Sequence, residues 1–402
     1  MKRKLYNKLL QHLPKKEFTI LTGARQTGKS TLLNDLRLHC QRRGIPEVFI
    51  NLENKTFLAE LNTNPLNLLS YLPTQEKKTV VFLDEIQYLS DPSNFLKLIY
   101  DDFQDKIKII ASGSSAFYID TKFKDSLAGR KRIFNLMTCD FEDYLMLQNK
   151  EELWKEVVRI KEQPLAKSLK LDLLRLEWEA YMIYGGYPAV ITESSIPEKA
   201  EMLKEIRDSF IKRDIVESGV QNEAVFYRLF QILASQTRQL VNVNELSNTL
   251  KSRNETIQNY LEIMEKCFHV TLVRPFYANL RKELVKMPKV YLLDAGLRNS
   301  LLNNFAPINQ RVDKGELWEQ AVFRILADQF GMDGIRFWRT ADSKEIDFVL
   351  PYENPPMAFE AKFDESLAKI KKYRLFMDTY PEFNFQFAGF QPWSEDFFRK
   401  FM

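Results

Sequence analysis

The chain has 402 residues, of which 45% are hydrophobic and 28% are charged, and its net charge is +4. A chain of this length exceeds what one hydrophobic core supports, so we expect a soluble protein of about two or three domains. No apolar run approaches the length of a membrane-spanning helix, and the basic residues 1–16 lack the apolar centre of a secretory signal. The three cysteines and three histidines lack zinc or disulfide spacing. This argues against zinc catalysis and favours the cytoplasm, with no membrane partner.

The first motif lies between a predicted strand, residues 18–22, and a helical pattern that begins at Thr31. It reads Gly-Ala-Arg-Gln-Thr-Gly-Lys-Ser and matches G-x-x-x-x-G-K-[ST] in the strand–loop–helix context that the motif requires. The glycines let consecutive backbone amides turn toward a polyphosphate, and the positive end of the helix dipole adds to this anion site. The predicted ATP-binding residues are Gly23, Ala24, Arg25, Gln26, Thr27, Gly28, Lys29, Ser30 and Thr31.

Within this loop, two side chains have separate predicted roles. Lys29 would reach the β- and γ-phosphates, and the Ser30 hydroxyl would bind Mg²⁺. The alternative is an ordinary glycine-containing turn between a strand and a helix, with an incidental Lys-Ser pair. The flanking strand and helix favour the nucleotide-binding interpretation.

Two acidic residues, Asp84 and Glu85, directly follow the apolar strand predicted at residues 79–83. Doubly wound sheets bind their ligands at the carboxyl ends of the strands, so both side chains are expected near the phosphates. We expect Asp84 to hold Mg²⁺, directly or through water, and Glu85 to be the general base that orients the attacking water. The alternative is a strand that ends in a polar turn.

Hydroxyl residues end a further strand at residues 106–114, and a basic turn follows. Ser114 is the candidate for a hydrogen bond to the γ-phosphate or the attacking water, but Ser112 or Ser115 could equally serve, or all three could form a turn. Arg130 is a candidate arginine finger toward a neighbouring subunit's nucleotide, with a solvated basic turn as the alternative. The alternation of strands and helices up to about residue 145 predicts a parallel sheet.

Helical patterns dominate the middle of the chain. Residues 140–215 are mainly helical around the turn Tyr-Gly-Gly-Tyr-Pro, which we interpret as a small lid over the nucleotide. Residues 243–250 and 254–264 form two amphipathic helices separated by a short break, and two short strands follow. Between Glu223 and Lys289, ten Lys or Arg stand against six Glu. This pattern predicts a winged helix that binds DNA or RNA, or alternatively one that only contacts proteins.

The last segment contains a second group of charged residues. Glu319 lies on the apolar stripe of a helix, where an uncompensated charge is costly. If Leu350 pairs with Met357 in a β-hairpin, Asp347 falls opposite Glu360. A lysine two residues further on shares that face. The predicted cluster consists of Glu319, Asp347, Glu360 and Lys362.

Carboxylates this close repel one another unless a cation lies between them. A second Mg²⁺ or a Mn²⁺ is the expected cation, and Lys362 could orient or help to deprotonate a metal-bound water. An Asp followed by Glu-x-Lys on adjacent strands is the arrangement of PD-(D/E)xK nucleases. The alternatives are a structural ion-pair cluster or a nuclease fold that no longer cuts.

Over nearly its whole length the chain resembles a prokaryotic AAA-type ATPase family that carries a C-terminal domain of unknown function. The segments that carry the resemblance are, in chain order, LTGARQTGKSTLL, VVFLDEIQYL, ASGSSAF, LAGR, GGYPAV, KRDI, KVYLLDAGLR, GELWEQAV, EIDFVL and FEAKF. The resemblance implies ATP and Mg²⁺ at the first site and a tail similar to restriction-type nucleases at the second. Ile346 rather than proline precedes Asp347, so the nominal Pro-Asp pair of these nucleases is absent.

The expected fold is α/β and has four parts. They are a P-loop AAA-type ATPase domain at 1–145, a helical lid at 146–215, a winged helix at 216–293 and a nuclease-like domain at 294–402. The leading hypothesis is an ATP-hydrolysing switch that repositions the C-terminal parts on DNA or RNA. The rivals are an ATP-regulated, metal-dependent nuclease and a signalling or scaffold ATPase with an inert tail. A second copy of the chain or another protein is a further candidate partner.

Overall fold

The computed structural model of the chain describes residues 3–73, 77–113, 127–163, 165–277, 283 and 286–401. It contains two compact units. The first comprises Met1–Thr138 with Lys266–Phe268, and the second comprises Cys139–Glu265 with His269–Met402. The expected division into four domains stays a prediction. No helix within the described ranges has both the length and the apolar character needed to cross a lipid bilayer.

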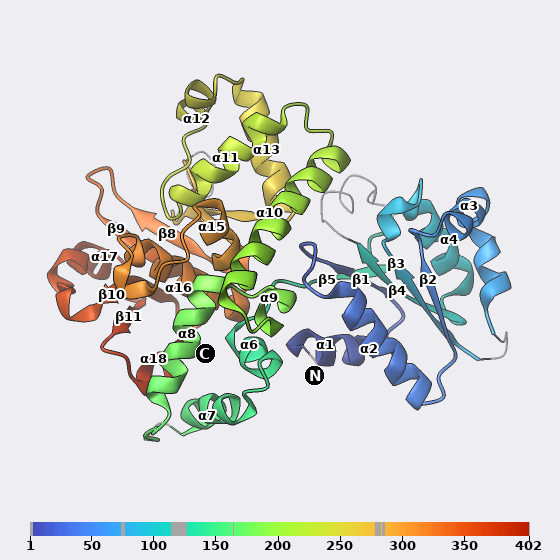
Figure 1. The fold of residues 1–402 in the computed structure, drawn as a ribbon, viewed down its shortest axis with the longest axis horizontal. Helices are drawn as coiled ribbons and strands as arrows, with labels where there is room; N and C mark the ends of the chain where they lie inside the picture. Colours follow the sequence, from blue (N-terminus) through green and yellow to red (C-terminus); the bar gives the residue numbers. More distant parts are fainter. Residues whose placement is uncertain are drawn as a thin grey trace. The chain divides into compact units, whose positions relative to one another are not determined.

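The first unit is built on a five-stranded sheet in the order β2-β3-β4-β1-β5, and every neighbouring pair is parallel (Figure 1). The predicted parallel sheet is therefore confirmed. Its strands are β1 (Phe18–Thr22), β2 (Glu47–Asn51), β3 (Thr79–Asp84), β4 (Ile107–Gly113) and β5 (Lys131–Asn135). The central strands β1, β3 and β4 are buried at every residue, which explains their nearly continuous apolar sequences.

Helices cover both faces of this sheet because successive residues of a strand point to opposite faces. They are α1 (Lys4–His12), α2 (Lys29–Arg42), α3 (Lys55–Thr63), α4 (Pro92–Phe103) and the short η1 (Pro65–Tyr71) and η2 (Ile86–Tyr88). Leu21 and Ile110 belong to the cluster that includes α1 and α2. Their neighbours Ile20 and Ala111 belong to the cluster that includes α3, η1 and α4. Two apolar layers thus hold the strand ends, and the loops that follow them, in fixed positions.

The second unit begins with a run of helices. They are α6 (Phe141–Leu147), α7 (Glu151–Glu162), α8 (Leu171–Tyr184), α9 (Pro188–Thr192), α10 (Ile196–Ser218), α11 (Glu223–Ser235), α12 (Val243–Leu250) and α13 (Asn254–Lys266). The two helices predicted on either side of a short break are thus present as α12 and α13, and Lys251 ends α12 in the left-handed conformation. Because α7 to α10 lie in the second unit, their predicted role as a lid over the nucleotide stays a prediction.

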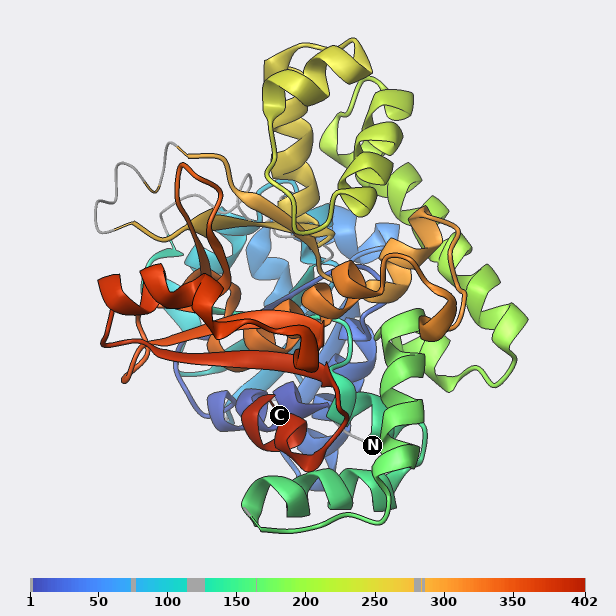
Figure 2. The ribbon, with the colours of Figure 1, turned by 90° about the vertical axis from the view of Figure 1, so that its left-hand side faces the viewer.

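The remaining strands of this unit form one six-stranded sheet in the order β11-β10-β9-β8-β6-β7. They are β6 (Val270–Pro275), β7 (Lys289–Leu292), β8 (Arg336–Arg339), β9 (Glu345–Leu350), β10 (Met357–Asp364) and β11 (Asn384–Gln391). Strand β6 pairs in antiparallel fashion with β7 and in parallel fashion with β8. The two short strands predicted after the helices, β6 and β7, therefore share a sheet with β8 to β11 of the predicted nuclease-like tail. In Figure 2 this part of the second unit faces the viewer.

Further helices complete the second unit. They are α15 (Ala295–Leu301), α16 (Lys314–Phe330), α17 (Arg374–Thr379), α18 (Glu395–Phe401) and the short η4 (Ile308–Gln310), η5 (Met332–Gly334), η6 (Glu365–Leu367) and η7 (Ile370–Tyr373). Helix α16 packs on β10 and brings Trp318 into the core, where its indole N–H donates to the Ala388 carbonyl at 2.8 Å. Pairing this donor is necessary because the indole is fully buried.

One buried carboxylate, that of Asp294, joins two of the glycine-containing motifs. It caps α15 by accepting from the Leu297 N–H at 3.0 Å, and it accepts from the Gly186 N–H at 2.8 Å. Gly186 belongs to the tight turn between α8 and α9, and a Cβ there would lie 2.2 Å from the Cys139 carbonyl oxygen. The motifs GGYPAV and LLDAGLR are therefore explained by close backbone packing around one acidic side chain.

Replacing Asp294 with Ala should destabilise the protein by about 3 kcal/mol, because a helix cap is lost and a buried amide is left without its acceptor. The matched control is Asn222→Ala, which removes the cap of α11, an exposed hydrogen bond to the Val225 N–H at 3.1 Å. That control should cost only about 1 kcal/mol. Urea unfolding measures both values, and equal losses would contradict the double role of Asp294.

Candidate functional site

The loop after β1 has the backbone shape of a phosphate cradle. Gly23 has φ 152° and Gly28 has φ 92°, and both values lie where L side chains are strained. A Cβ on Gly23 would also lie 2.1 Å from the Leu136 carbonyl oxygen. Only glycine fits there. Gly28 is the first residue before α2, so the loop ends at the positive end of a 14-residue helix.

The side chains of the loop are held by its own carbonyl groups. The Lys29 ammonium is buried and donates to the carbonyls of Gly23 at 2.9 Å and Ala24 at 2.7 Å. The Thr27 hydroxyl also donates to the Ala24 carbonyl, at 2.8 Å. Lys29 must leave these carbonyls to reach a phosphate. Ser30 is exposed in the first turn of α2, where its hydroxyl is accessible to a metal ion.

The two predicted acidic residues, Asp84 and Glu85, lie at the edge of the sheet from which the phosphate loop also starts. Asp84 ends β3, and Ser112 of the neighbouring strand β4 donates its hydroxyl to the Asp84 carboxylate. The same hydroxyl oxygen accepts from the Glu85 N–H at 3.3 Å. Because β4 lies between β3 and β1, Ser112 links the acidic pair to the strand that carries the phosphate loop.

Glu85 adopts a left-handed backbone conformation, with φ 59° and ψ 50°. This conformation is costly for a residue with a side chain and is concentrated at functional sites, where the surrounding structure imposes it. The Glu85 carboxylate accepts a hydrogen bond from the Gln87 side-chain amide. A carboxylate at this edge, oriented by a second side chain, has the chemistry required of a group that positions water.

The residues present fit a bound Mg²⁺–nucleotide. The loop offers backbone amides, one ammonium and one hydroxyl, and the β3 edge offers two carboxylates. The buried hydroxyl of Thr22, which directly precedes the loop, has no hydrogen-bond partner within the described residues. The Thr22 hydroxyl is therefore still able to form a hydrogen bond beside the start of the loop.

Two of the predicted catalytic residues, Ser114 and Arg130, do not belong to the group of residues described above. Ser114 and its alternative Ser115 lie outside the described residues, whereas the alternative Ser112 is the serine beside Asp84. Arg130 forms an ion pair with Asp101, with Nε 2.7 Å from Oδ1. Arg130 precedes the amino end of β5, which is in parallel register with β1, so it lies at the sheet edge opposite the loop. Its role toward a neighbouring subunit stays a prediction.

The second predicted cluster is brought together in the second unit. Leu350 pairs with Met357, which is the register that the hairpin required. The Asp347 N–H donates to the Glu360 carboxylate at 3.3 Å, and the Ala361 N–H donates to the Asp347 carboxylate at 3.0 Å. These contacts agree with the expected position of Asp347 opposite Glu360.

Glu319 and Glu360 each have a tyrosine partner that the sequence did not indicate. Glu319 of α16 accepts a hydrogen bond from the Tyr291 hydroxyl at 2.8 Å. Glu360 accepts from the Lys362 ammonium at 2.5 Å and from the Tyr373 hydroxyl at 2.9 Å. No sequence spacing predicts these tyrosines, because they come from β7 and η7 and meet the carboxylates only through the tertiary fold.

Lys289 is the most important residue that the sequence did not reveal. Its side chain is 3% exposed, and its ammonium lies 3.6 Å from a Glu319 oxygen, 2.5 Å from a Glu345 oxygen and 3.7 Å from an Asp347 oxygen. Three acidic side chains from α16 and β9 thus surround one cation from β7. The ammonium thus lies beside two of the three carboxylates, Glu319 and Asp347, between which a metal ion was expected.

The pKa values follow from burial and from these neighbours. Burial and the nearby Asp347 raise the pKa of Glu319 to about 7 and that of Glu360 to about 8. Burial lowers the pKa of Lys289, but the surrounding carboxylates outweigh this and raise it above its usual value. The lysine therefore stays charged and compensates its acidic neighbours. Within the described residues, no group of three acidic, His or Cys side chains is arranged to hold a metal ion.

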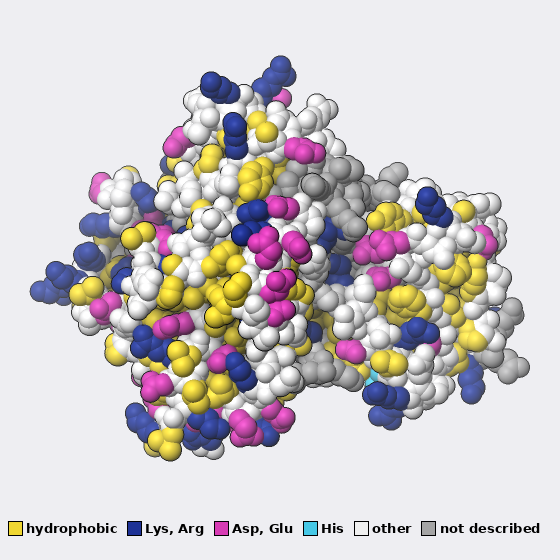
Figure 3. All heavy atoms as spheres, viewed as in Figure 1, with side chains coloured by type: hydrophobic (Ala, Val, Ile, Leu, Met, Phe, Trp, Pro, Cys, Tyr) yellow, Lys and Arg dark blue, Asp and Glu magenta, His cyan; other side chains and the backbone are white. Residues whose placement is uncertain are grey.

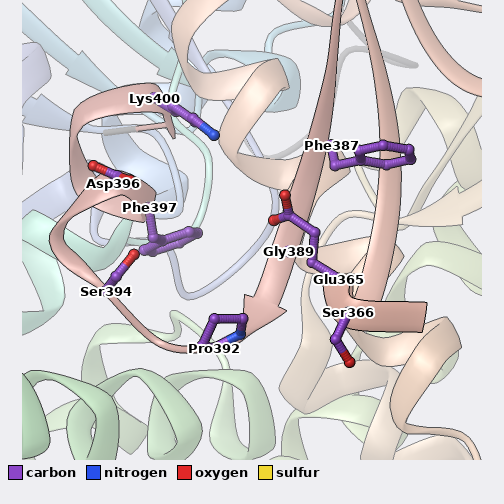
Figure 4. Close-up of a pocket in the computed structure, with 9 residues that line it drawn as sticks. All are labelled: Glu365, Ser366, Phe387, Gly389, Pro392, Ser394, Asp396, Phe397 and Lys400. Carbon is purple, nitrogen blue, oxygen red and sulfur yellow. The ribbon is translucent and has the colours of Figure 1, made fainter. Parts of the chain in front are cut away.

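Two hollows in the second unit lie outside these clusters. One, of about 350 Å³, lies between η6, β11 and α18, and Figure 4 shows Glu365, Phe397 and Lys400 lining it. The other is a groove of about 470 Å³ along α12, α13 and β6, whose lining includes Asn244, Gln258, Arg274 and Lys286. The first mixes both charges with aromatic rings. The second combines side-chain amides and cations with two acidic side chains, Glu262 and Glu265, and several apolar residues.

Replacing Lys289 with Met should destabilise the protein by about 4 kcal/mol, because buried carboxylates would lose their compensating cation. The loss should grow from pH 5 to pH 8. Glu319 has a raised folded-state pKa of about 7, so the stability gained from its bound proton is lost as the pH rises through that value. Below it the side chain is protonated and needs no cation, whereas above it the ionised carboxylate needs Lys289.

The control is Lys286→Met on the exposed approach to β7, which should change stability by less than about 0.5 kcal/mol. Denaturant unfolding at several pH values gives these numbers. A Lys289→Met protein as stable as the wild type would mean that the carboxylates need no cation.

Comparisons with known proteins agree with the geometry of the first unit. Residues 15–145 match the family described as "AAA domain". Residues 175–307 and 314–388 match two families that are each described as a domain of unknown function. Uncharacterised proteins of Haemophilus influenzae and Mycobacterium tuberculosis are each 25% identical to this chain. The alignments cover 82% of this chain and 78% of the first protein, and 88% of this chain and 72% of the second.

Solved structures give only weak likenesses. The Thermotoga maritima RuvB Holliday junction branch migration motor has a TM-score of 0.34 at 15% identity, over 71% of this chain and 95% of RuvB. The ADP form of the Aeropyrum pernix ORC2 protein has a TM-score of 0.35 at 12% identity, over 75% of this chain and 93% of that protein. Scores this low support no conclusion. The match of residues 15–145 to the AAA domain family agrees with the parallel sheet and the glycine loop of the first unit.

Proposed function

We propose that this protein is a Mg²⁺-dependent ATPase in which the nucleotide state of the first unit controls the second. The observation that carries the proposal is the juxtaposition, on one sheet edge, of the Gly23–Gly28 loop with Asp84, Ser112 and Glu85. The AAA domain match of residues 15–145 supports the same activity. Phosphoryl transfer depends mainly on positioning and charge stabilisation, which is what these groups supply.

Each group has a definite task in this reaction. The amides between Gly23 and Gly28 bind the phosphate oxygens, and Lys29 exchanges its loop carbonyls for the β- and γ-phosphates. Ser30 and Asp84 would hold Mg²⁺, which neutralises charge that develops on the phosphates. Ser112 fixes the Asp84 carboxylate, and Glu85 orients the attacking water and accepts its proton.

Glu85→Gln should retain ATP binding but slow hydrolysis about a thousandfold, because the amide cannot accept a proton from water. The matched control is Glu53→Gln, which changes an exposed glutamate of the same unit. ATP affinity is measured by calorimetry and turnover by phosphate release. Unchanged turnover in Glu85→Gln would refute the assignment of the base, and absence of ATP binding in the wild type would refute the proposed function.

A second candidate function is nucleic-acid binding by the part of the second unit that contains α12, α13, β6 and β7. Lys251 and Arg253 are exposed in the turn between the helices, and Arg274 and Lys286 line the adjoining groove. In Figure 3, separate Lys and Arg side chains project from the end of the second unit that holds α12 and α13, with acidic side chains among them. Basic side chains together with side-chain amides suit a phosphate backbone and base edges.

The exposed face of α13 limits how DNA or RNA would bind. Glu255 and Glu262 are exposed on this helix and would repel phosphates. The proposed contacts therefore run through the basic turn and the β6 side of the groove rather than along the whole helix.

The charge-reversed double variant Lys251→Glu/Arg253→Glu should bind duplex DNA at least about tenfold more weakly than the wild type. Its affinity should also depend less on salt, with the slope of log affinity against log salt reduced by about 2, because two phosphate contacts are lost. Lys371→Glu/Lys372→Glu changes the net charge equally at exposed residues of η7 and serves as the control. Fluorescence anisotropy at several salt concentrations measures both. Equal behaviour of the two variants would favour the scaffold alternative.

The charge cluster of the second unit favours a structural role over metal-dependent cleavage. A catalytic Mg²⁺ or Mn²⁺ at Glu319 and Asp347 would have to displace the Lys289 ammonium, a like charge that is already buried there. We therefore do not propose a nuclease activity. If a second copy of the chain is the partner, Arg130 would have to leave Asp101 to reach that subunit's nucleotide.

A further inference from the structure

Arg3, at the start of α1, joins the phosphate loop to the end of the first unit. Its guanidinium donates from Nη1 to the Thr27 carbonyl at 3.1 Å. It also donates from Nη2 to the Met137 carbonyl at 3.0 Å and to the Thr138 carbonyl at 3.2 Å. These acceptors are 24, 134 and 135 residues away in sequence. One partly buried side chain therefore connects two backbone segments through three carbonyl groups.

The helix that carries Arg3 is firmly packed. Tyr6 and Leu9 of α1 are buried in the same apolar cluster as Leu32 and Leu36 of α2, the helix that follows the loop. The Arg3 carbonyl also accepts the first helical hydrogen bond of α1, from the Tyr6 N–H at 2.9 Å. Arg3 is thus fixed at its backbone, and its guanidinium holds a rigid fork of donors against the loop.

The segment 136–138 touches the phosphate loop at a second point. Leu136 donates its N–H to the Thr22 carbonyl at 2.7 Å, and its own carbonyl lies where a Cβ on Gly23 would be. Residues 136–138 therefore contact the phosphate loop at two points. One is its start, at Gly23, and the other is near its end, where Arg3 links them to Thr27. A change in the shape of the loop cannot leave these three residues unaffected.

The same segment leads directly into the second unit. Cys139 is the first residue of that unit, and it is held there by two hydrogen bonds. Its N–H donates to the Gly186 carbonyl at 2.7 Å, and its carbonyl accepts from the Tyr181 hydroxyl at 2.8 Å. A displacement of residues 136–138 is consequently delivered, through the chain itself, to the glycine turn that Asp294 organises.

We propose that Arg3 is a positioning residue that transmits the state of the phosphate loop to residues 136–138 and so to the start of the second unit. The inference rests on the proposed ATP-binding function. When Lys29 leaves the Gly23 and Ala24 carbonyls for a phosphate, the loop changes its internal hydrogen bonds. Arg3 couples that change to Met137 and Thr138, because its guanidinium binds their carbonyls and the Thr27 carbonyl of the loop at the same time.

The test is hydrogen–deuterium exchange of the full-length protein with and without Mg²⁺–ATP, in the wild type, Arg3→Ala and Arg3→Lys. In the wild type, ATP should slow amide exchange about fivefold both in the loop, residues 23–30, and in residues 136–139. In both variants the protection of the loop should remain, with ATP affinity within about threefold of the wild type, whereas the response of residues 136–139 should be lost. Lysine keeps the charge but cannot span three carbonyls, so it should not rescue the response.

Arg42→Ala, at an exposed residue at the end of α2, is the matched control and should behave like the wild type. If the Arg3 variants keep the ATP response of residues 136–139, even with a lower melting temperature, Arg3 is only a structural residue and the proposal is wrong. If the wild-type loop itself gains no protection from ATP, the proposed function fails first. Should Arg3→Ala not fold, Arg3→Lys alone decides between these outcomes.

Discussion

The positive φ angles at Gly23 and Gly28 are the constraint on which the first unit depends. They turn the backbone so that the loop can present its N–H groups to a phosphate, and the buried parallel strands keep the loop beside Asp84 and Glu85. The close approach of Gly23 to the Leu136 carbonyl means that the loop is shaped by the residue that follows β5 as well as by its own residues. The arrangement is thus a property of the sheet edge rather than of the loop alone.

The second unit depends on a different balance, between burial and charge. Carboxylates on α16, β9 and β10 lie in the interior, where an isolated charge would cost several kcal/mol. Lys289, Tyr291 and Tyr373 compensate them with an ammonium group and two hydroxyl groups. The buried carboxylates of this unit are therefore compensated by groups of the protein itself.

The connection between the two units gives the proposed ATPase a physical means of acting. Residues 136–138 contact the phosphate loop through Gly23 and Arg3, and Cys139 is tied to the glycine turn of the second unit.

Much of this protein is readable from local patterns in its sequence. The strand at Phe18–Thr22, the helix that begins at Lys29 and the pairing of Leu350 with Met357 all follow from residue type and spacing, because these depend on neighbours close along the chain. The position of Asp347 opposite Glu360 follows from the same hairpin. The parallel sheet of the first unit and the glycine-containing loop after its first strand were accordingly accessible without a structure.

Contacts between residues far apart in sequence were not accessible in this way. Lys289 contacts Glu319 and Asp347. Ser112 contacts Asp84, and Arg3 contacts Thr138. No spacing in the sequence predicts any of these pairs. They arise because packing of whole helices and strands brings distant side chains together, after which burial makes each unpaired charge too costly to leave uncompensated. Local sequence determined which helices and strands form and where the glycine-containing loop lies. The packing of the core determined which cation compensates each buried carboxylate, as Lys289 does for Glu319.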